Sequence, residues 1–437
     1  MKEIPDSTID IISQYINETS NKPSHIPIIT VDDDVNTPRY FEIVPFDEID
    51  NSDCKYFAID GSYNSQEFYN GIYIGLYTAG YICFHKGKQI RQNDLNDPVI
   101  LGKSYFPQNI LITNDFHRYA IFDELLTLEP VKKLLLFFNE PEVDNIWGLG
   151  KETRQIICSS VSKLLAFCQE ILEWSLVLEI LQLAIIQSGD FILRDGTLRS
   201  LNINQKYLIK IGELAHTKNV SLIAVTKKSP IKLELASSFK KIDFYLQNDK
   251  KPSYPFTIQT KRWQKLCCWF EVSDDVLLGA YPEAGERKNI QDGTISKATK
   301  YSMFATNNLN GGRGFGVFYV ARLDYVEKLQ NYDWVVLDIN IFDAIPGITV
   351  KMNEREVRTA KRNLSMLEIL FKELTRLTQE HYILGYPYPL VEAHNFVTIK
   401  NNFNDEIINR VKASLYKSQM MDHVDIENLF LDIHERF

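Results

Sequence analysis

The sequence lacks the features that mark secreted, zinc-binding and membrane proteins. None of its six cysteines forms a Cys-x-x-Cys pair or has a histidine at the spacing of a zinc site. We therefore expect reduced thiols of an intracellular protein. The first residues hold no apolar segment typical of a signal peptide. The longest apolar stretch, residues 156–187, contains one lysine and three glutamates, which excludes a membrane span. These absences predict a cytoplasmic protein without membrane contact.

The chain also lacks an excess of basic residues and a nucleotide-binding loop. Its net charge is −9, which argues against broad coating of nucleic acid but leaves room for a local basic groove beside a metal site. The glycine cluster at residues 311–314 is not followed by Gly-Lys-Ser or Gly-Lys-Thr. Any ATP-driven movement of a substrate would therefore depend on another protein.

The pattern of apolar runs predicts an α/β fold with a central mixed β-sheet flanked by helices. Strand-like runs lie at residues 56–59, 72–82, 191–194, 220–226, 316–323 and 334–339, and helical patterns lie at 151–188, 205–218, 354–378 and 405–419. We expect the first two strands to be adjacent and antiparallel, with Gly75 and Gly80 at bends or bulges. At about 150 residues per domain, 437 residues allow two or three domains or a single elaborated one.

Two of these strands deliver an aspartate at their ends. Residues 56–59 lead into Asp60-Gly-Ser, and residues 191–194 lead into Asp195-Gly-Thr. A single Asp-Gly pair most often closes a hairpin, which is how we interpret Asp292-Gly293, because polar residues precede it. Two copies after apolar runs favour a site for Mg²⁺ or Mn²⁺, since carboxylate oxygens on rigid strands suit a hard cation.

Further ligands are needed for a divalent metal site, and the chain offers several candidates. The long apolar helix carries Glu170, Glu173 and Glu179, of which Glu179 stands among Leu, Val and Ile. A carboxylate there is costly unless it is paired or metal-bound; a lysine partner or an outward-turned helix face are the alternatives. His394 follows a Tyr-Pro-Tyr-Pro segment and Lys227 follows the strand at 220–226. A lone histidine is more often structural, and a lysine after a strand is usually solvated.

Taken in order, these blocks resemble the NurA nuclease family. The blocks are Ala58-Ile-Asp-Gly-Ser, a helix glutamate before Leu193-Arg-Asp-Gly-Thr-Leu, Ala224-Val-Thr-Lys, and Gly385-Tyr-Pro-Tyr-Pro-Leu with Ala393-His. The resemblance implies an RNase H-like core at residues 51–400 with an insertion at about 240–315. Residues 1–50 are then an N-terminal helical and loop extension, and residues 401–437 a helical tail.

The resemblance also implies roles for individual residues. Asp60 is similar to the family's first-strand ligand, Asp195 to its second aspartate and Glu179 to its helix glutamate, with Glu173 as the alternative for that position. The remaining matches are His394 and Tyr386, which resemble the C-terminal pair of the site, and Lys227, which resembles the lysine after the later strand. The expected ligands of two Mn²⁺ or Mg²⁺ ions are then Asp60, Glu179, Asp195 and His394.

The activity that the resemblance implies is hydrolysis of DNA by a metal-dependent nuclease. Family members act as 5′-to-3′ exonucleases and single-strand endonucleases, form dimers, and work with HerA, a hexameric DNA-translocating ATPase, in end resection. Repair and defence against phage both fit this setting. Two alternatives stay open from the sequence. One is a catalytically silent adaptor that docks on a ring ATPase, and the other is an RNase H-fold enzyme that cuts RNA or DNA junctions.

Overall fold

The structure is a computed structural model, and the chain divides into two compact units. The β13 unit, named after β13 (Trp334–Asn340), comprises Met1–Ser52, Asp195–Arg199 and Ser221–Tyr388. The β2 unit, named after β2 (Lys55–Glu67), comprises Asp53–Arg194, Ser200–Val220 and Pro389–Phe437. The structure describes residues 7, 9–14, 39–42, 53–67, 73–90, 103–104, 110–113, 125–148, 151–200, 202–226, 232, 266–271, 286–288, 295–297, 315–323, 334–352, 356–357, 360–379, 385–399 and 401–418.

The β2 unit is built on a mixed sheet, as the sequence predicts. Strand β2 pairs in antiparallel fashion with β3 (Tyr73–His85) and in parallel with β7 (Phe191–Asp195). Three short strands also pair with β3: β4 (Lys88–Gln89), β5 (Lys103–Ser104) and β6 (Ile110–Thr113). The apolar residues 56–59 are all buried in β2, in keeping with their strand propensity. The α/β class and the antiparallel pairing of the first two strands are confirmed.

The predicted bends or bulges at Gly75 and Gly80 are wrong. The register of β2 and β3 runs without interruption from one end of the ladder to the other, and both glycines have a partner in it. A Cβ atom on Gly75 would lie 2.8 Å from both methyl carbons of Leu165. Glycine at this position therefore allows a helix to approach the strand closely, and the chain does not need it for a turn.

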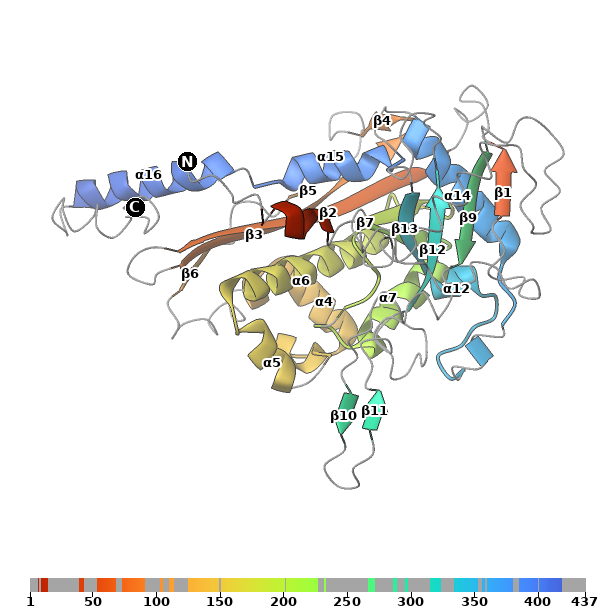
Figure 1. Cartoon of the computed structure of the whole chain (residues 1–437), viewed down its shortest axis with the longest axis horizontal. Helices are drawn as coiled ribbons and strands as arrows, with labels where there is room; N and C mark the ends of the chain where they lie inside the picture. The colour runs from red at the N-terminus through yellow and green to blue at the C-terminus, as the bar shows by residue number, and fades with distance from the viewer. Residues whose placement is uncertain are drawn as a thin grey trace. The chain divides into compact units, whose positions relative to one another are not determined.

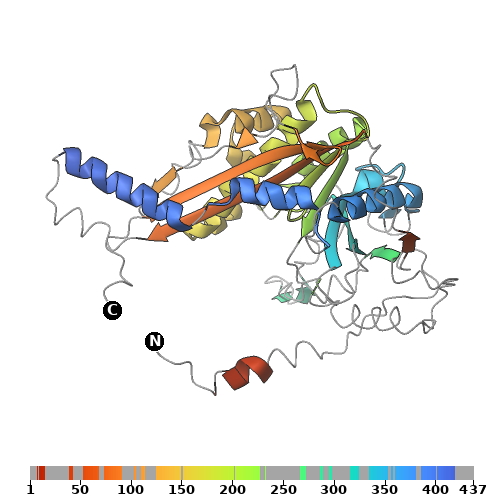
Figure 2. The same ribbon diagram turned by 90° about the horizontal axis from the view of Figure 1, so that it is seen from above.

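The two faces of this sheet meet different helices, because successive side chains of a strand point to opposite faces. On one face lies α6 (Val161–Gln182), whose Ser162 hydroxyl is 3.4 Å from that of Tyr63. The other face meets α15 (Tyr388–Val397), and just after this helix the N–H of Ile399 donates to the Ser62 hydroxyl. Figure 1 shows the β2–β3 ribbon between the two helices. Figure 2 shows α15 and α16 (Asn401–Ser418) running along it.

The β13 unit is an antiparallel sheet covered by a helix. Strand β13 lies between β8 (Ser221–Thr226) and β12 (Gly316–Arg322), and β12 continues to β9 (Leu266–Glu271) and β1 (Arg39–Glu42). Helix α14 (Leu364–Gln379) packs on it through Phe371, whose ring stacks on Trp269 with centroids 4.6 Å apart. Arg362 donates two hydrogen bonds of 2.8 Å to the Glu271 carboxylate. Two further strands, β10 (Glu286–Lys288) and β11 (Ile295–Lys297), form a separate hairpin.

Two predicted helices have different bounds in the structure. The long pattern at 151–188 forms two helices, α5 (Lys151–Ile157) and α6, because the Ser160 hydroxyl caps α6 by accepting from the N–H of Lys163. The pattern at 354–378 becomes helix α14 only at Leu364, since residues 360–363 are not helical. The predicted helix at 205–218 is confirmed as α7 (Gln205–Thr217). Helix α4 (Glu129–Phe138) packs on α6.

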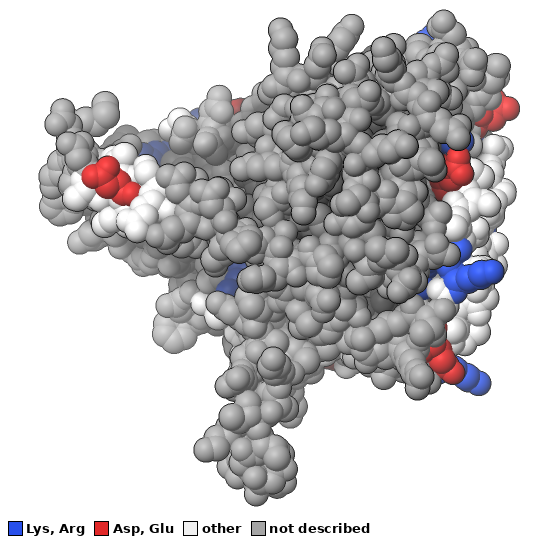
Figure 3. Space-filling model, turned by 45° about the vertical axis from the view of Figure 1, so that its right-hand side comes forward, with Lys and Arg blue, Asp and Glu red and all other residues white. Residues whose placement is uncertain are grey.

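Charged side chains of both signs occur together on the described surface. In Figure 3, acidic and basic residues alternate along the right-hand edge of the view. Among the described residues, no helix combines the length and the apolar composition needed to cross a membrane.

Candidate metal centre

The two aspartates singled out by the sequence come from neighbouring parallel strands. In the ladder of β2 and β7, the last paired residues are Ile59 and Arg194, so Asp60 and Asp195 follow at the same level. Side chains at the same level of neighbouring strands point to the same face of the sheet. Asp60 and Asp195 therefore share one face, and the preceding residues, Ile59 and Arg194, point to the other. Asp60 is 5% exposed and Asp195 is half-buried.

The Asp60 carboxylate is held at both of its oxygens. Its Oδ1 accepts a hydrogen bond of 2.7 Å from the backbone N–H of Gly61. Its Oδ2 lies 2.7 Å from Nδ1 of His394, which α15 presents to this face of the sheet. The side chain of His394 is 49% exposed, whereas that of Asp60 is 7% exposed. The histidine therefore connects a buried carboxylate to the solvent.

The three side chains form a donor set suited to a divalent cation. Ligand atoms from Asp60, Asp195 and His394 all lie within 4.8 Å of one another. Ligands of one cation, each roughly 2.0–2.6 Å from it, lie at most about 5 Å apart, so the three side chains can share an ion. Two carboxylate oxygens and an imidazole nitrogen suit Mn²⁺, and the oxygens suit Mg²⁺. The residues present therefore fit the divalent ions that the sequence predicts.

The remaining predicted residues are placed differently. Glu179 lies half-buried on α6, the helix on the opposite face of the sheet, and its charge adds to burial in raising the pKa of Tyr81. It is not in the group of three ligands, and its role as a ligand stays a prediction. Tyr386 is buried, and its hydroxyl donates to the carbonyl of Val225 over 3.3 Å. Lys227 lies outside the described residues.

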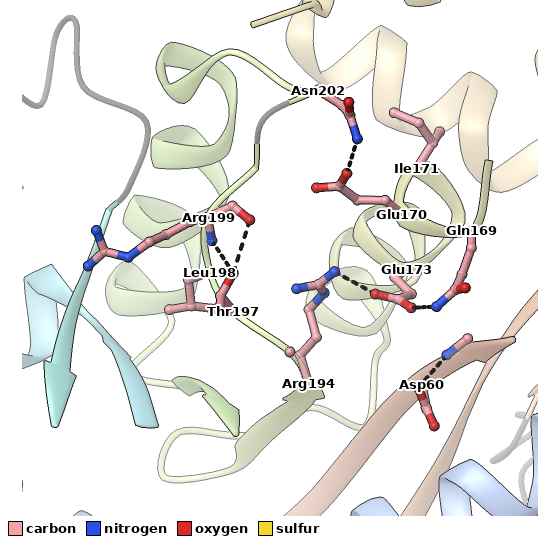
Figure 4. A network of polar contacts seen from close by, with 12 residues as sticks. Asp60, Gln169, Glu170, Ile171, Glu173, Arg194, Thr197, Leu198, Arg199 and Asn202 are labelled. Atoms are coloured by element: carbon pink, nitrogen blue, oxygen red, sulfur yellow. Dashed lines mark hydrogen bonds and ion pairs between the residues drawn. The ribbon is translucent and has the colours of Figure 1, made fainter. Parts of the chain in front are cut away.

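A buried polar network lies on the α6 face, behind the two aspartates. Figure 4 shows the carboxyl group of Glu173 between two donors. Nη2 of Arg194 lies 2.5 Å from its Oε2, and Nε2 of Gln169 donates to its Oε1 over 2.6 Å. Burial raises the pKa of Glu173 to about 7, although Arg194 and Gln169 act in the opposite direction. The guanidinium of Arg194 also lies 5.0 Å from the ring centre of Trp174.

The pairing of Glu173 with Arg194 has a signal in the sequence. Arg194 stands inside a strand of apolar residues, directly before Asp195. Because a buried charge needs a partner, an acidic residue on the facing helix is expected for Arg194. The sequence indicates Glu173 as an alternative ligand, but the structure places it in this ion pair.

The loop that follows Asp195 is anchored inside the β13 unit. The N–H of Gly196 donates to the carbonyl of Val225, which also accepts from Tyr386, and Thr226 donates to the carbonyl of Gly196. Further along the loop, a buried carboxylate of β13 accepts hydrogen bonds from the N–H of Leu198 and from Nε of Arg199. That carboxylate belongs to Asp338, which sequence reasoning missed although it interrupts the apolar run of β13. Figure 4 shows the contacts between Thr197 and Arg199 in the same loop.

Residues 54–399 match the model of the NurA domain. Among solved structures, the chain is similar to the crystal structure of the NurA nuclease from Sulfolobus solfataricus. The sequence identity is 14% and the TM-score 0.42, over 94% of this chain and 96% of that chain. No curated protein sequence matches the chain.

Proposed function

The chain belongs to the NurA family of nucleases, and from this membership we propose that it is a metal-dependent deoxyribonuclease. The match to the family model confirms the resemblance that the sequence predicts. The observation that carries the proposal is the convergence of Asp60, Asp195 and His394, whose ligand atoms lie within 4.8 Å of one another. An RNase H-like core, as the resemblance implies, stays a prediction.

Each residue of the site has a proposed role in phosphodiester hydrolysis. Asp60 and Asp195 would hold the cations, and the contacts of Asp60 to Gly61 and His394 fix its orientation. When bound, two divalent cations supply an activated water and offset the charge on the phosphate and the leaving oxygen. His394, whose half-exposed ring has its Nδ1 2.7 Å from Asp60, would complete the ligand shell of a cation or stabilise the leaving oxygen. Lys227 would complement the charge of the phosphate.

The substrate and the partners are inferred from the family. We propose 5′-to-3′ exonuclease and single-strand endonuclease activity on DNA, by a chain that acts as a homodimer. The sequence has no nucleotide-binding loop, so ATP-driven movement of DNA would come from a HerA-type hexameric translocase. End resection in repair and defence against phage are both consistent with such a pair.

The proposal is tested by measuring Mn²⁺ binding and DNA cleavage on the same variants. Asp60→Asn keeps the size of the side chain but removes the charge that a cation needs. We expect it to abolish cleavage of end-labelled linear DNA and to weaken Mn²⁺ binding in calorimetry. Asp53→Asn is the matched control, because Asp53 is an exposed aspartate just before β2 and pairs with Lys86. Wild-type binding and cleavage by Asp60→Asn would reject the site, and a folded wild-type protein that binds no Mn²⁺ would favour the silent adaptor.

A further inference from the structure

Glu173 touches both strands that carry the metal-site aspartates, but from the reverse face of the sheet. Through Oε2 it pairs with Arg194, the residue before Asp195 on β7. Through Oε1 it lies against Gly61, the residue after Asp60 on β2: a Cβ on Gly61 would be 2.6 Å from that oxygen. Glu173 is 3% exposed, so both contacts are shielded from water.

Glu173 meets the sheet on the face opposite to the metal-site aspartates. Its two oxygens accept hydrogen bonds from Gln169 and from Arg194. The alternation of side chains along β2 and β7 directs Asp60 and Asp195 to the α15 face, whereas Arg194 and Glu173 meet on the α6 face. The Glu173 carboxyl group and the metal-site aspartates therefore lie on opposite faces of the sheet. Figure 4 shows Glu173 and Asp60 on α6 and β2.

We propose that Glu173 is a positioning residue that fixes the ends of β2 and β7 so that Asp60 and Asp195 can share a cation. The proposal rests on the proposed metal-dependent function. A small relative shift of β2 and β7 changes the distance between the carboxylates of Asp60 and Asp195. Contacts that hold metal ligands in place typically contribute about 10–100-fold to metal affinity. Glu173 acts here as a brace, with Arg194 as its connection to β7 and Gln169 keeping its carboxyl group against Gly61.

The test compares Mn²⁺ affinity of Glu173→Gln, Arg194→Gln and the double variant by calorimetry, on proteins whose circular dichroism matches the wild type. A brace predicts that each single substitution weakens binding at least about tenfold. It also predicts that the double variant binds Mn²⁺ almost as tightly as either single variant, because the two single substitutions remove the same contact between Glu173 and Arg194. If Glu173 were a ligand, Arg194→Gln would leave the affinity unchanged or raise it by freeing the carboxylate, and this outcome would overturn the proposal.

A matched control lies one turn away on the same helix. Glu170 accepts a hydrogen bond of 2.6 Å from Nδ2 of Asn202, a residue of neither β2 nor β7. Glu170→Gln should therefore leave Mn²⁺ affinity unchanged, and an equal loss in Glu170→Gln and Glu173→Gln would reduce the effect to a general loosening of α6. If Glu173→Gln does not fold, Gln169→Leu removes the weaker of the two holding contacts and should lower the affinity by a smaller factor; unchanged affinity there counts against the brace.

Activity measurements separate a brace from the site itself. Excess Mn²⁺ should restore most of the cleavage rate of Glu173→Gln, because the lost quantity is affinity for the ion, but it should not restore Asp60→Asn. Failure of the two proposals can be told apart. Unchanged Mn²⁺ binding in Asp60→Asn refutes the metal centre, whereas loss in Asp60→Asn with unchanged binding in Glu173→Gln refutes the brace alone.

Discussion

Asp338 of β13 anchors the loop that follows Asp195. Its substitution tests how much a buried ion pair contributes to the free energy of unfolding. Its side chain is fully buried, and Oδ2 accepts from the N–H of Leu198 over 2.9 Å and from Nε of Arg199 over 3.1 Å. The guanidinium of Arg199 also donates to the carbonyl of Gly316 over 2.5 Å and lies 4.0 Å from the ring centre of Phe318. These groups belong to one unit of the fold.

Asp338→Asn keeps the shape of the side chain and removes its charge. The variant leaves the buried guanidinium of Arg199 without the carboxylate that it faces, and breaking a buried pair in this way costs about 3–5 kcal/mol. An asparagine oxygen still accepts one hydrogen bond, so we expect the low end, about 3 kcal/mol, which is about a hundredfold in the ratio of folded to unfolded protein. Replacing both partners with Asp338→Leu and Arg199→Met should be less destabilising than the single change, because no charge stays buried.

Urea denaturation followed by tryptophan fluorescence measures this effect, because the buried Trp334 lies on the same strand as Asp338. The control is Glu406→Gln on α16, which breaks an exposed pair with Arg410 and should change stability by less than about 1 kcal/mol. The reasoning would be refuted if the free energy of unfolding of Asp338→Asn lay within about 0.5 kcal/mol of the wild-type value, or if the double variant were less stable than Asp338→Asn. Such results would show that the desolvation of Arg199 is offset by contacts other than Asp338.

The aspartates of the site could be predicted because their signal is local. An apolar run that ends in Asp-Gly is visible within eight residues, and the chain shows it twice, at Asp60 and Asp195. The contact of His394 with Asp60 joins residues 334 positions apart, so no short pattern contains it. The resemblance to a family provided that residue, and the parallel register of β2 and β7 provides the physical reason why the aspartates meet.

The glutamates of α6 could not be ranked from the sequence, and the reason lies in the helix itself. Apolar residues are buried on every side of α6, so its periodicity does not reveal which side meets the sheet. The sequence favoured Glu179 because apolar residues surround it, yet the structure leaves Glu179 half-buried and buries Glu173 instead. The partner that settles the position of Glu173 is Arg194 on β7, 21 residues further along the chain. Tertiary pairing decides here, where local pattern does not.

Two further predictions concern the packing and the charge of Glu173. Gly61→Ala should destabilise the protein by about 1–3 kcal/mol in urea denaturation. The added Cβ would overlap Gln169 and lie 2.6 Å from Oε1 of Glu173. A gain in stability, which reduced backbone freedom alone would give, would contradict this packing. The second is a dependence of stability on pH. Burial raises the pKa of Glu173 from 4.5 to about 7, so between these values the folded protein binds more protons than the unfolded chain. The contribution of this group to the free energy of unfolding is therefore complete below pH 4.5 and is lost as the pH rises to about 7, with a slope of at most about 1.4 kcal/mol per pH unit. Urea titrations at several pH values should show this fall in the wild type and a shallower one in Glu173→Gln, which cannot titrate at this position; equal slopes would mean that Arg194 keeps Glu173 ionised throughout.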